Sequence, residues 1–260
     1  MAKGGWAKFP YADKDYDYAG AALKKNWARL HRGDCEPYPD DPSVQEAWRC
    51  YHRGDFGRAI EQGLAAGAAG VNVANKAAAI YATYLEKSAP RKLKLLEDAA
   101  QRAEKAIKAH PKDANAHYLH ALALGRYGQG ISVAAALKKG LGGKIKGSLE
   151  TAIKLQAKHA DAHIGLGAWH AEIVAKVGAL VGGMTYGAKK DAAVEHFKKA
   201  LKLNPDSAIA RIEYANALAM MFGDERMKEA EKLYAEAAKC KPADAMERLD
   251  VESAKAELED

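Results

Sequence analysis

The chain has 260 residues, 48% hydrophobic and 28% charged, which suits one large folded domain or two small ones. The net charge is +6, and the lysine doublets lie among alanines and acidic residues, so no nucleic-acid partner is expected. No stretch of about 20 apolar residues occurs, which argues against a membrane-spanning helix. β-Branched runs and alternating patterns are scarce while alanine is abundant, so the predicted class is all-α.

The first 39 residues are predicted to be an N-terminal extension with one helix over residues 14–32. The start of the chain lacks an apolar signal region, which fits a cytoplasmic N-terminus or a mature exported chain. Cys35 and Cys50 could pair and pin this helix to the next one, which makes sense only in an oxidising compartment. We therefore expect a periplasmic location, with the cytoplasm as the alternative. Cys240 is expected to be a small buried residue.

A repeated pattern of small residues, a helix end, a polar residue and further alanines dominates the rest of the chain. Its leading residues Ala106, Ala152, Ala200 and Ala237 lie 46, 48 and 37 residues apart. A fifth copy ends near Ala66. Each copy is interpreted as two antiparallel helices, which places five helix pairs over residues 40–242.

The ends of these helices carry recognisable signals. Pro111, Pro205 and Pro242 cannot continue the preceding helix, and the Asp or Ser that follows can cap the next one. Small residues stand where paired helices must touch: Ala47, Ala59, Ala99, Ala121, Gly167, Ala193, Ala215 and Ala230. One pair cannot bury its apolar face alone, so the pairs are expected to stack into a solenoid.

A C-terminal capping helix is predicted within residues 243–260. Its charged residues suit a terminal repeat with a wet outer side. They are Glu247, Arg248, Asp250, Glu252, Lys255 and Glu257.

The repeat resembles the tetratricopeptide (TPR) family over roughly residues 40–245. The residues that carry the resemblance are Ala193, Phe197, Ala200 and Pro205, and again Ala230, Tyr234, Ala237 and Pro242. The resemblance implies an α-α superhelix and a non-catalytic scaffold that binds a protein or peptide in its concave groove. The groove residues it implies are Trp48, Tyr51, Asn75, Ala78, Asn115, Tyr118, Leu122, Asp161, Ile164, Ala168, Ile212 and Asn216. Apolar side chains replace the lysines of a carboxylate clamp, which favours an apolar segment, a partner helix or a lipid-like molecule.

Two central units are longer than the usual 34 or so residues of a TPR unit. The insertions cover residues 125–143 and 173–187, and each has an apolar helical stretch followed by a Gly-Gly pair. Because they interrupt neighbouring units at corresponding points, we expect them on the same side. They form an interface or ligand groove, or a lid that completes the core, and the sequence allows both. Their apolar residues are Ile131, Val133, Leu137, Leu141, Val177, Leu180, Val181, Met184 and Tyr186.

Reactive chemistry is weakly represented. Packing between helices is favoured over metal binding for His117, His120, His163 and His170, because Asp161 and Glu172 are the only carboxylates near them in sequence. We therefore expect no metal and no cofactor. No nucleophile-elbow or Cys-His-Asn pattern occurs, so an enzyme is not predicted.

A scaffold for a protein or peptide is therefore the leading function, and self-association into a homo-oligomer is plausible. The alternative is a periplasmic accessory protein that handles a hydrophobic ligand for a transport system, since the chain also resembles the TPR-like T components of tripartite (TRAP) periplasmic transporters. An apolar tunnel beneath residues 131–143 and 173–187 would favour the second function. An open groove with asparagines spaced for an extended backbone would favour the first.

Overall fold

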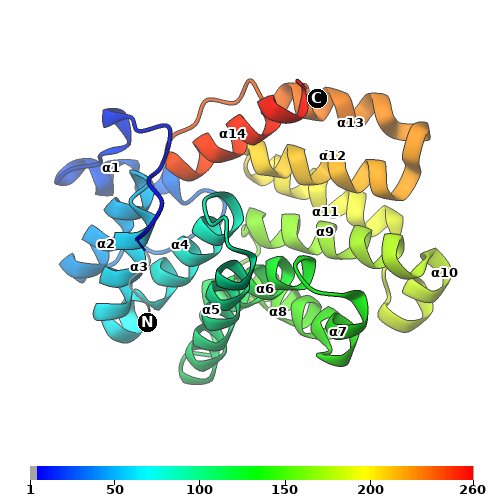
Figure 1. Ribbon diagram of the computed structural model, residues 1–260, viewed down its shortest axis with the longest axis horizontal. Coiled ribbons are helices and arrows are strands. Elements are labelled where there is room, and N and C mark those ends of the chain that lie inside the picture. Colours follow the sequence, from blue (N-terminus) through cyan, green and yellow to red (C-terminus); the bar gives the residue numbers. More distant parts are fainter. Residues whose placement is uncertain (1–4, 260) are drawn as a thin grey trace.

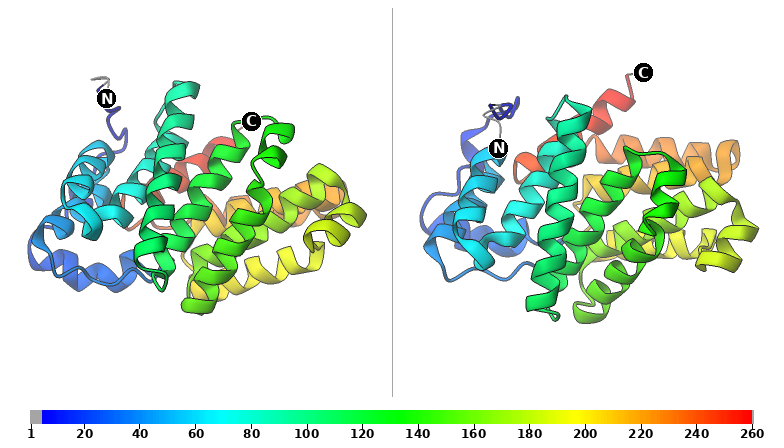
Figure 2. Two further views of the ribbon diagram at one scale, coloured as in Figure 1. Left: turned by 90° about the horizontal axis from the view of Figure 1, so that it is seen from below. Right: turned by 60° about the horizontal axis from the view of Figure 1, so that its bottom comes forward.

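The computed structural model describes residues 5–259, and the regular structure within that range is helical throughout. Antiparallel helix pairs stack side by side into a curved superhelix (Figures 1 and 2), which confirms the predicted all-α, TPR-like fold. The pairs are α2 (Pro42–His52) with α3 (Phe56–Ala65), α4 (Val71–Tyr84) with α5 (Ala89–Ala109), α6 (Ala114–Gln129) with α8 (Leu141–Leu155), α9 (Ala160–Val177) with α11 (Lys190–Leu203), and α12 (Ala208–Phe222) with α13 (Met227–Ala237).

The first helix of each of the last three pairs begins at a capping side chain. The carboxylate of Asp113 accepts the backbone N–H groups of Asn115 and Ala116, and the Ser207 hydroxyl accepts that of Ala210. His159 has this position at the start of α9, where its ring nitrogen accepts the N–H of Ala162. A cap of this kind typically stabilises a helix by about 1 kcal/mol. The predicted helix starts therefore have a local physical cause.

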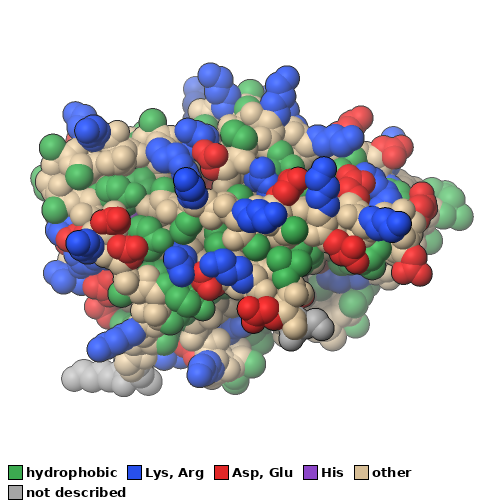
Figure 3. Space-filling model, turned by 90° about the horizontal axis from the view of Figure 1, so that it is seen from above, with side chains coloured by type: hydrophobic (Ala, Val, Ile, Leu, Met, Phe, Trp, Pro, Cys, Tyr) green, Lys and Arg blue, Asp and Glu red, His purple; other side chains and the backbone are tan. Residues whose placement is uncertain are grey.

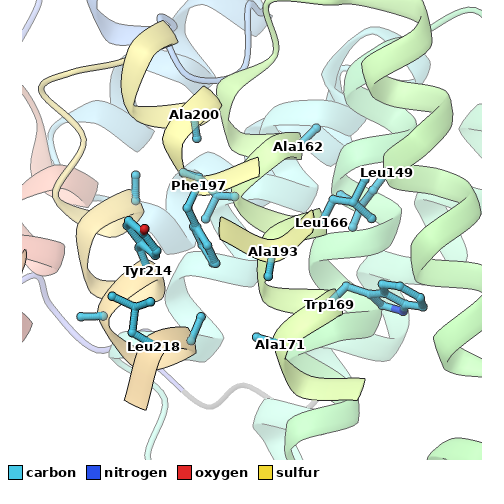
Figure 4. Close-up of a cluster of buried hydrophobic side chains, with 14 of the residues drawn as sticks. Leu149, Ala162, Leu166, Trp169, Ala171, Ala193, Phe197, Ala200, Tyr214 and Leu218 are labelled. Atoms are coloured by element: carbon cyan, nitrogen blue, oxygen red, sulfur yellow. The ribbon is translucent and has the colours of Figure 1, made fainter. Parts of the chain in front are cut away.

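Small residues let the helices of neighbouring pairs approach closely. Phe197 of α11 is fully buried between α9 and α12, where it stacks on the Tyr214 ring with centroids 5.2 Å apart (Figure 4). A Cβ atom on Gly167 of α9 would lie only 2.9 Å from that phenylalanine ring. Ala193 and Ala200 beside it are also fully buried. The small residues of the repeat thus make room for the aromatic ones.

The two long units carry short helices between their paired helices. The first insertion forms α7 (Val133–Lys138), and the second forms α10 (Ala179–Val181) and the π-helical turn η3 (Gly182–Tyr186). Single 3-10 turns occur at η2 (Gly67–Gly70) and η4 (Gly223–Arg226).

The N-terminal extension differs from the expected helix over residues 14–32. It contains a 3-10 turn, η1 (Lys14–Tyr16), and a shorter helix, α1 (Ala21–Leu30). Gly20 precedes α1 with φ of 57°, a left-handed conformation that interrupts any longer helix. The expected length was therefore wrong, but α1 is anchored because Leu23, Trp27 and Leu30 are buried against the first repeats.

The C-terminal helix α14 (Ala245–Glu257) returns across the superhelix toward the N-terminal repeats (Figure 1). Asp244 accepts a hydrogen bond from His52 Nδ1 at 2.8 Å, and the Tyr84 hydroxyl donates to Asp250. Arg29 of α1 forms a bidentate ion pair with Glu247 at 2.6 and 2.8 Å. The expected wet charged face was therefore wrong for part of this helix, since Asp250 is only 3% exposed. Its carboxylates tie the two ends of the superhelix together.

Two further features concern the length of the helices and the surface charge. No helix within residues 5–259 is long and apolar enough to cross a bilayer. On the face drawn in Figure 3, basic and acidic side chains are interspersed, with no block of one sign.

Candidate binding pocket

An apolar pocket opens on the concave side of the superhelix. Its cavity volume is about 220 Å³, and its walls come from α4, α6, α7, α8, α9, α12 and α14, with contributions from α1, the link after it and η3. The lining is dominated by aliphatic and aromatic side chains. The main apolar ones are Ile80, Tyr118, Leu122, Leu137, Leu141, Ile145, Leu149, Ile164, Trp169, Ile173, Val177, Tyr186, Ile209 and Met246. A concave apolar cavity with few polar groups is the usual form of a ligand site.

Some of the predicted groove residues line the pocket. Tyr118, Leu122, Asp161 and Ile164 line it, together with Ala168. These residues come from α6 and α9, the first helices of neighbouring pairs, whose inward faces are adjacent in the superhelix. This part of the groove is therefore an apolar concave surface.

The remaining groove residues do not line the pocket, because the chain itself already contacts them. Asn115 donates to the Glu36 carboxylate at 2.6 Å and meets His159 at 3.0 Å. Arg102 donates to Asn75 at 2.9 Å, and the Tyr234 hydroxyl donates to Asn216. The asparagines expected to hold a peptide backbone are thus engaged within the protein.

The apolar groove residues outside the pocket are covered in the same way. Trp48 and Tyr51 are each only 1% exposed and belong to an aromatic cluster that includes Trp27 and His31. The other two are also buried, since Ala78 is fully inaccessible and Ile212 packs in a small cluster with α14 residues. At these positions the expected binding surface was wrong, because the N- and C-terminal segments already cover it.

The segment that follows α1, residues 31–36, fills the N-terminal part of the groove. It carries a buried charge cluster. Lys76 of α4 forms an ion pair with Asp34, whose second oxygen accepts from His31 at 2.9 Å. Lys76 is 4% exposed and Asp34 is 2% exposed. Although burial opposes it, Lys76 and then His31 hold the pKa of Asp34 well below its ordinary value. The cluster therefore holds the segment in place as a permanent charge pair.

Two further carboxyls near this segment behave differently. Burial, followed by the charges of Asp34 and Asp113, raises the pKa of Glu36 to about 8. Burial also raises the pKa of Asp161 to about 6, although Lys76 acts against it. The Asp161 backbone N–H donates to the Gly33 carbonyl at 3.0 Å, and a Cβ atom on Gly33 would overlap the Asp161 carboxyl. The link after α1 is therefore fitted closely to the start of α9.

Each of the two insertions has some apolar residues that line the pocket and others that do not. Val133, Leu137, Leu141, Val177 and Tyr186 line the pocket. Leu141 is buried, whereas Val133 and Leu137 are about half exposed, so α7 forms a rim with apolar side chains facing solvent. Four insertion residues, Ile131, Leu180, Val181 and Met184, do not line the pocket. The insertions thus contribute both wall and exposed apolar surface.

Charged and polar side chains also line the pocket, among them Asp34, Lys76, Arg126, Gln129, Asp161, Glu172, Glu213, Glu247 and Asp250. Arg126 pairs with Glu213 at 2.7 Å, and that carboxylate, despite the opposing effect of burial, raises the pKa of the arginine. Burial raises the pKa of Asp250 well above its ordinary value, with Tyr84 donating to it. Gln129 donates to Glu172 at 2.7 Å. These polar groups are paired with one another within the pocket wall, which lowers the cost of burying them there.

Three of the four histidines pack between helices, whereas His117 contacts the loop before its own helix. His163 Nδ1 lies 2.8 Å from His196 Nδ1, and His170 stacks on the same ring with centroids 5.8 Å apart. His120 contacts the Ser148 hydroxyl at 2.8 Å, and His117 contacts the Pro111 carbonyl at 3.0 Å. Across residues 5–259, no group of three or more His, Cys, Asp or Glu side chains is arranged to hold a metal ion.

The three cysteines are free thiols. Cys35 Sγ lies 3.5 Å from the Lys158 carbonyl, whereas Cys50 is fully buried with Sγ 3.2 Å from the Gln62 side chain. The expected Cys35–Cys50 staple was wrong, because the two thiols face different neighbours. Cys240 is only partly buried. The periplasmic location rested on the staple and stays an untested prediction.

A protein-family model describing regulator of microtubule dynamics protein 1-3 (RMD1-3) matches residues 69–260, which is most of the chain. The chain belongs to this family. The match begins just before α4 and extends over the helices that line the pocket, apart from α1, whose Leu30 also contributes to the lining. No curated protein matches the sequence.

Two solved structures of TPR proteins match this chain. The structure of TTC0263, a thermophilic TPR protein in Thermus thermophilus, superposes with a TM-score of 0.58 at 18% identity, over 82% of this chain and 97% of that one. YrrB, described as a TPR protein with an unusual peptide-binding site, matches at 15% identity over 91% of this chain and all of that one, with a TM-score of 0.42. The first likeness supports the fold of this family member, in agreement with the repeat pattern.

The buried charge cluster was missed in the sequence, although one signal was present. Lys76 stands within the run Ala74-Asn-Lys-Ala-Ala-Ala79, where the other side chains are small or amide. A lysine on such a helix face is rarely buried without a partner. Nothing in the sequence indicated that Asp34 is that partner, because 42 residues separate them.

Proposed function

We propose that this protein is a non-catalytic scaffold that binds an apolar part of its partner in the concave pocket. The observation that carries the proposal is the convergence of two separate residue sets on one cavity. Leu122 and Ile164 come from the inward faces of repeat helices, and Leu137 and Val177 come from the insertions. An apolar cavity rimmed by half-exposed apolar side chains suits a hydrophobic anchor.

The form of the partner follows from what the pocket lacks. The asparagines at positions 75, 115 and 216 bind groups of the protein itself, so they do not offer a ladder for an extended peptide backbone. A partner helix that inserts one or two apolar side chains needs no such ladder, because its backbone bonds are satisfied internally. The half-exposed Val133 and Leu137 on α7 provide the surface on which its apolar face would rest.

A hydrophobic small molecule is the second candidate. It is favoured by the position of the pocket beneath both insertions, where Leu141 and Tyr186 form part of the wall. A small apolar ligand would be held by burial alone, with few polar contacts fixing its orientation. The two candidates differ in what co-purifies with the protein.

The family description suggests one partner system to test. It relates its members to microtubule dynamics, and we carry that over to this chain as a candidate for the protein partner. Co-sedimentation with polymerised tubulin, with and without associated proteins, tests it directly.

The main experiment fills the pocket without disturbing the fold. Ala168 lines the pocket and is partly exposed, so Ala168→Trp places an indole in the cavity. Ala109 is exposed at the end of α5, so Ala109→Trp is the matched control. Wild type and both variants are used for affinity capture from lysate and for solvent extraction, each followed by mass spectrometry.

The outcomes separate the two candidates. Proteins retained by wild type and Ala109→Trp but lost with Ala168→Trp support a protein anchor in the pocket. A small molecule extracted from the same two proteins and absent from Ala168→Trp supports the second candidate. Equal retention of every partner by all three proteins, with unchanged circular dichroism, would show that the pocket is not the binding site.

A further inference from the structure

The second insertion ends in a protruding apolar tip, residues 178–187, formed by α10 and η3. Leu180 is 76% exposed and Met184 is 82% exposed, and Val181 between them is about half exposed. They include the two most exposed large hydrophobic side chains of residues 5–259. The tip lies at one extremity of the long axis of the molecule (Figure 1). Such side chains at a convex end are not covered by the fold itself.

The tip is built to tolerate an apolar environment. No Asp, Glu, Lys or Arg occurs between Lys176 and Lys189. Its backbone is internally bonded, since the Gly182 N–H donates to the Gly178 carbonyl at 2.9 Å and the Gly187 N–H donates to the Gly183 carbonyl at 3.0 Å. Backbone groups that are already bonded remove the main penalty for leaving water.

Lysines occur in α8, which contacts the tip, and in the segment that follows the tip. Lys146 of α8 donates to the Tyr186 carbonyl at 3.0 Å, so the start of α8 is in direct contact with η3. Lys144 on the same helix and Lys189 after the tip are both exposed. Within the described part of the chain, neither has a carboxylate within ion-pair distance, whereas Lys176 is paired with Glu172 at 2.7 Å. The tip therefore combines exposed apolar side chains with lysines whose charge is uncompensated.

We propose that the tip docks on an anionic phospholipid surface. Leu180 and Met184 enter the boundary between headgroups and acyl chains, and Lys144 and Lys189 contact the phosphates. Apolar side chains beside lysines suit an interfacial site, because long lysine stems keep their charges at headgroup level. A protruding end fits a flat surface, whereas a partner helix requires a groove. The attachment is peripheral and independent of what the pocket binds.

Flotation with phospholipid vesicles tests this proposal on the full chain. One set of vesicles is pure phosphatidylcholine, and the other contains equal parts of phosphatidylcholine and phosphatidylserine. The tip variant is Leu180→Ser with Met184→Ser. Its matched control is Leu258→Ser with Met220→Ser, which removes one exposed leucine and one exposed methionine elsewhere. A charge variant carries Lys144→Gln with Lys189→Gln.

Wild type and the control are expected to float with the phosphatidylserine vesicles and to be released by high salt. The tip variant should lose about tenfold or more in partition coefficient, because each buried methylene contributes to interfacial binding. The charge variant should lose binding to the phosphatidylserine vesicles and should behave like wild type with pure phosphatidylcholine. The pocket variant Ala168→Trp should bind both kinds of vesicle like wild type. The proposal is overturned if wild type does not float, or if tip and control variants float equally. A change from dimer to monomer in the tip variant without any flotation of wild type would instead assign the tip to a second copy of the chain.

Discussion

Two helix glycines offer a sharp test of how the repeats pack. A Cβ atom at Gly167 in α9 would lie 2.9 Å from Cε2 and 3.0 Å from Cδ2 of Phe197. That ring is fully buried and stacked on Tyr214, so it has little room to retreat. Gly147 in α8 is exposed and would place its Cβ in open space. The same substitution to alanine therefore probes packing at one site and helix propensity at the other.

The two substitutions are expected to change stability in opposite directions. Gly147→Ala should gain about 0.5–1 kcal/mol, because alanine restricts the unfolded chain and favours the helix. Gly167→Ala has the same gain, but overpacking against a buried ring costs about 1–3 kcal/mol, which leaves a net loss of about 1 kcal/mol. The two variants should thus differ by about 2 kcal/mol in the free energy of unfolding.

Urea unfolding followed by far-UV circular dichroism measures this difference. The midpoint should rise for Gly147→Ala and fall for Gly167→Ala, with the slope unchanged. The reasoning is refuted if Gly167→Ala is as stable as Gly147→Ala, because Phe197 would then not fill the space that the glycine leaves.

Three further predictions concern buried titratable groups. Lys76→Ala should destabilise the protein by about 3–5 kcal/mol, because it leaves the buried Asp34 without its partner, and adding Asp34→Asn should restore part of the loss in the same unfolding assay. The Glu36 carboxyl has a pKa of about 8 in the folded protein against an ordinary 4.5. Its contribution to the free energy of unfolding is therefore fully present below pH 4.5 and is lost as pH rises from 4.5 to 8. Glu36→Gln should remove this dependence and be relatively stabilising at neutral pH by on the order of 3 kcal/mol, whereas a constant difference between wild type and Glu36→Gln across that range would contradict the assignment. Burial, together with His196, lowers the pKa of His163 and His170 to about 4. The contribution of these two rings to stability is fully present above pH 6.5 and is lost as pH falls from 6.5 to 4. In the Glu36→Gln background, adding His163→Gln and His170→Gln should therefore reduce the fall in stability over that range, and an unchanged profile would show that the rings titrate freely.

The repeat architecture was predictable because its signals are local. Ala193, Phe197 and Ala200 follow one another at intervals of four and three residues, which places them on one face of a helix. The residues that cap α6 and α12 lie within three positions of the backbone groups they bond. Such patterns recur in each unit, so the sequence identifies helix pairs without any knowledge of distant contacts. The aromatic and small residues at these positions then pack as the pattern requires.

The covered part of the groove could not be predicted, because it depends on contacts between distant segments. Asn115 was expected to face a partner, but it binds Glu36, which lies 79 residues earlier. Asp250 was assigned to an exposed face because it is one of the charged residues of a terminal helix, and only the return of α14 toward Tyr84 buries it. Neither the N-terminal segment nor α14 repeats the pattern of the other units, so periodicity carried no information about where they dock.

The most direct test of the account is photo-crosslinking from the pocket rim compared with the covered groove. A benzophenone amino acid is introduced at Leu137, which lines the pocket and is half exposed, or at Asn216, which was expected in the groove but bonds Tyr234. Irradiation of each protein with its captured partner is followed by mass spectrometry of the adducts. Adducts are expected from position 137 and none from position 216. Adducts from position 216, with or without adducts from position 137, would contradict binding in the pocket alone.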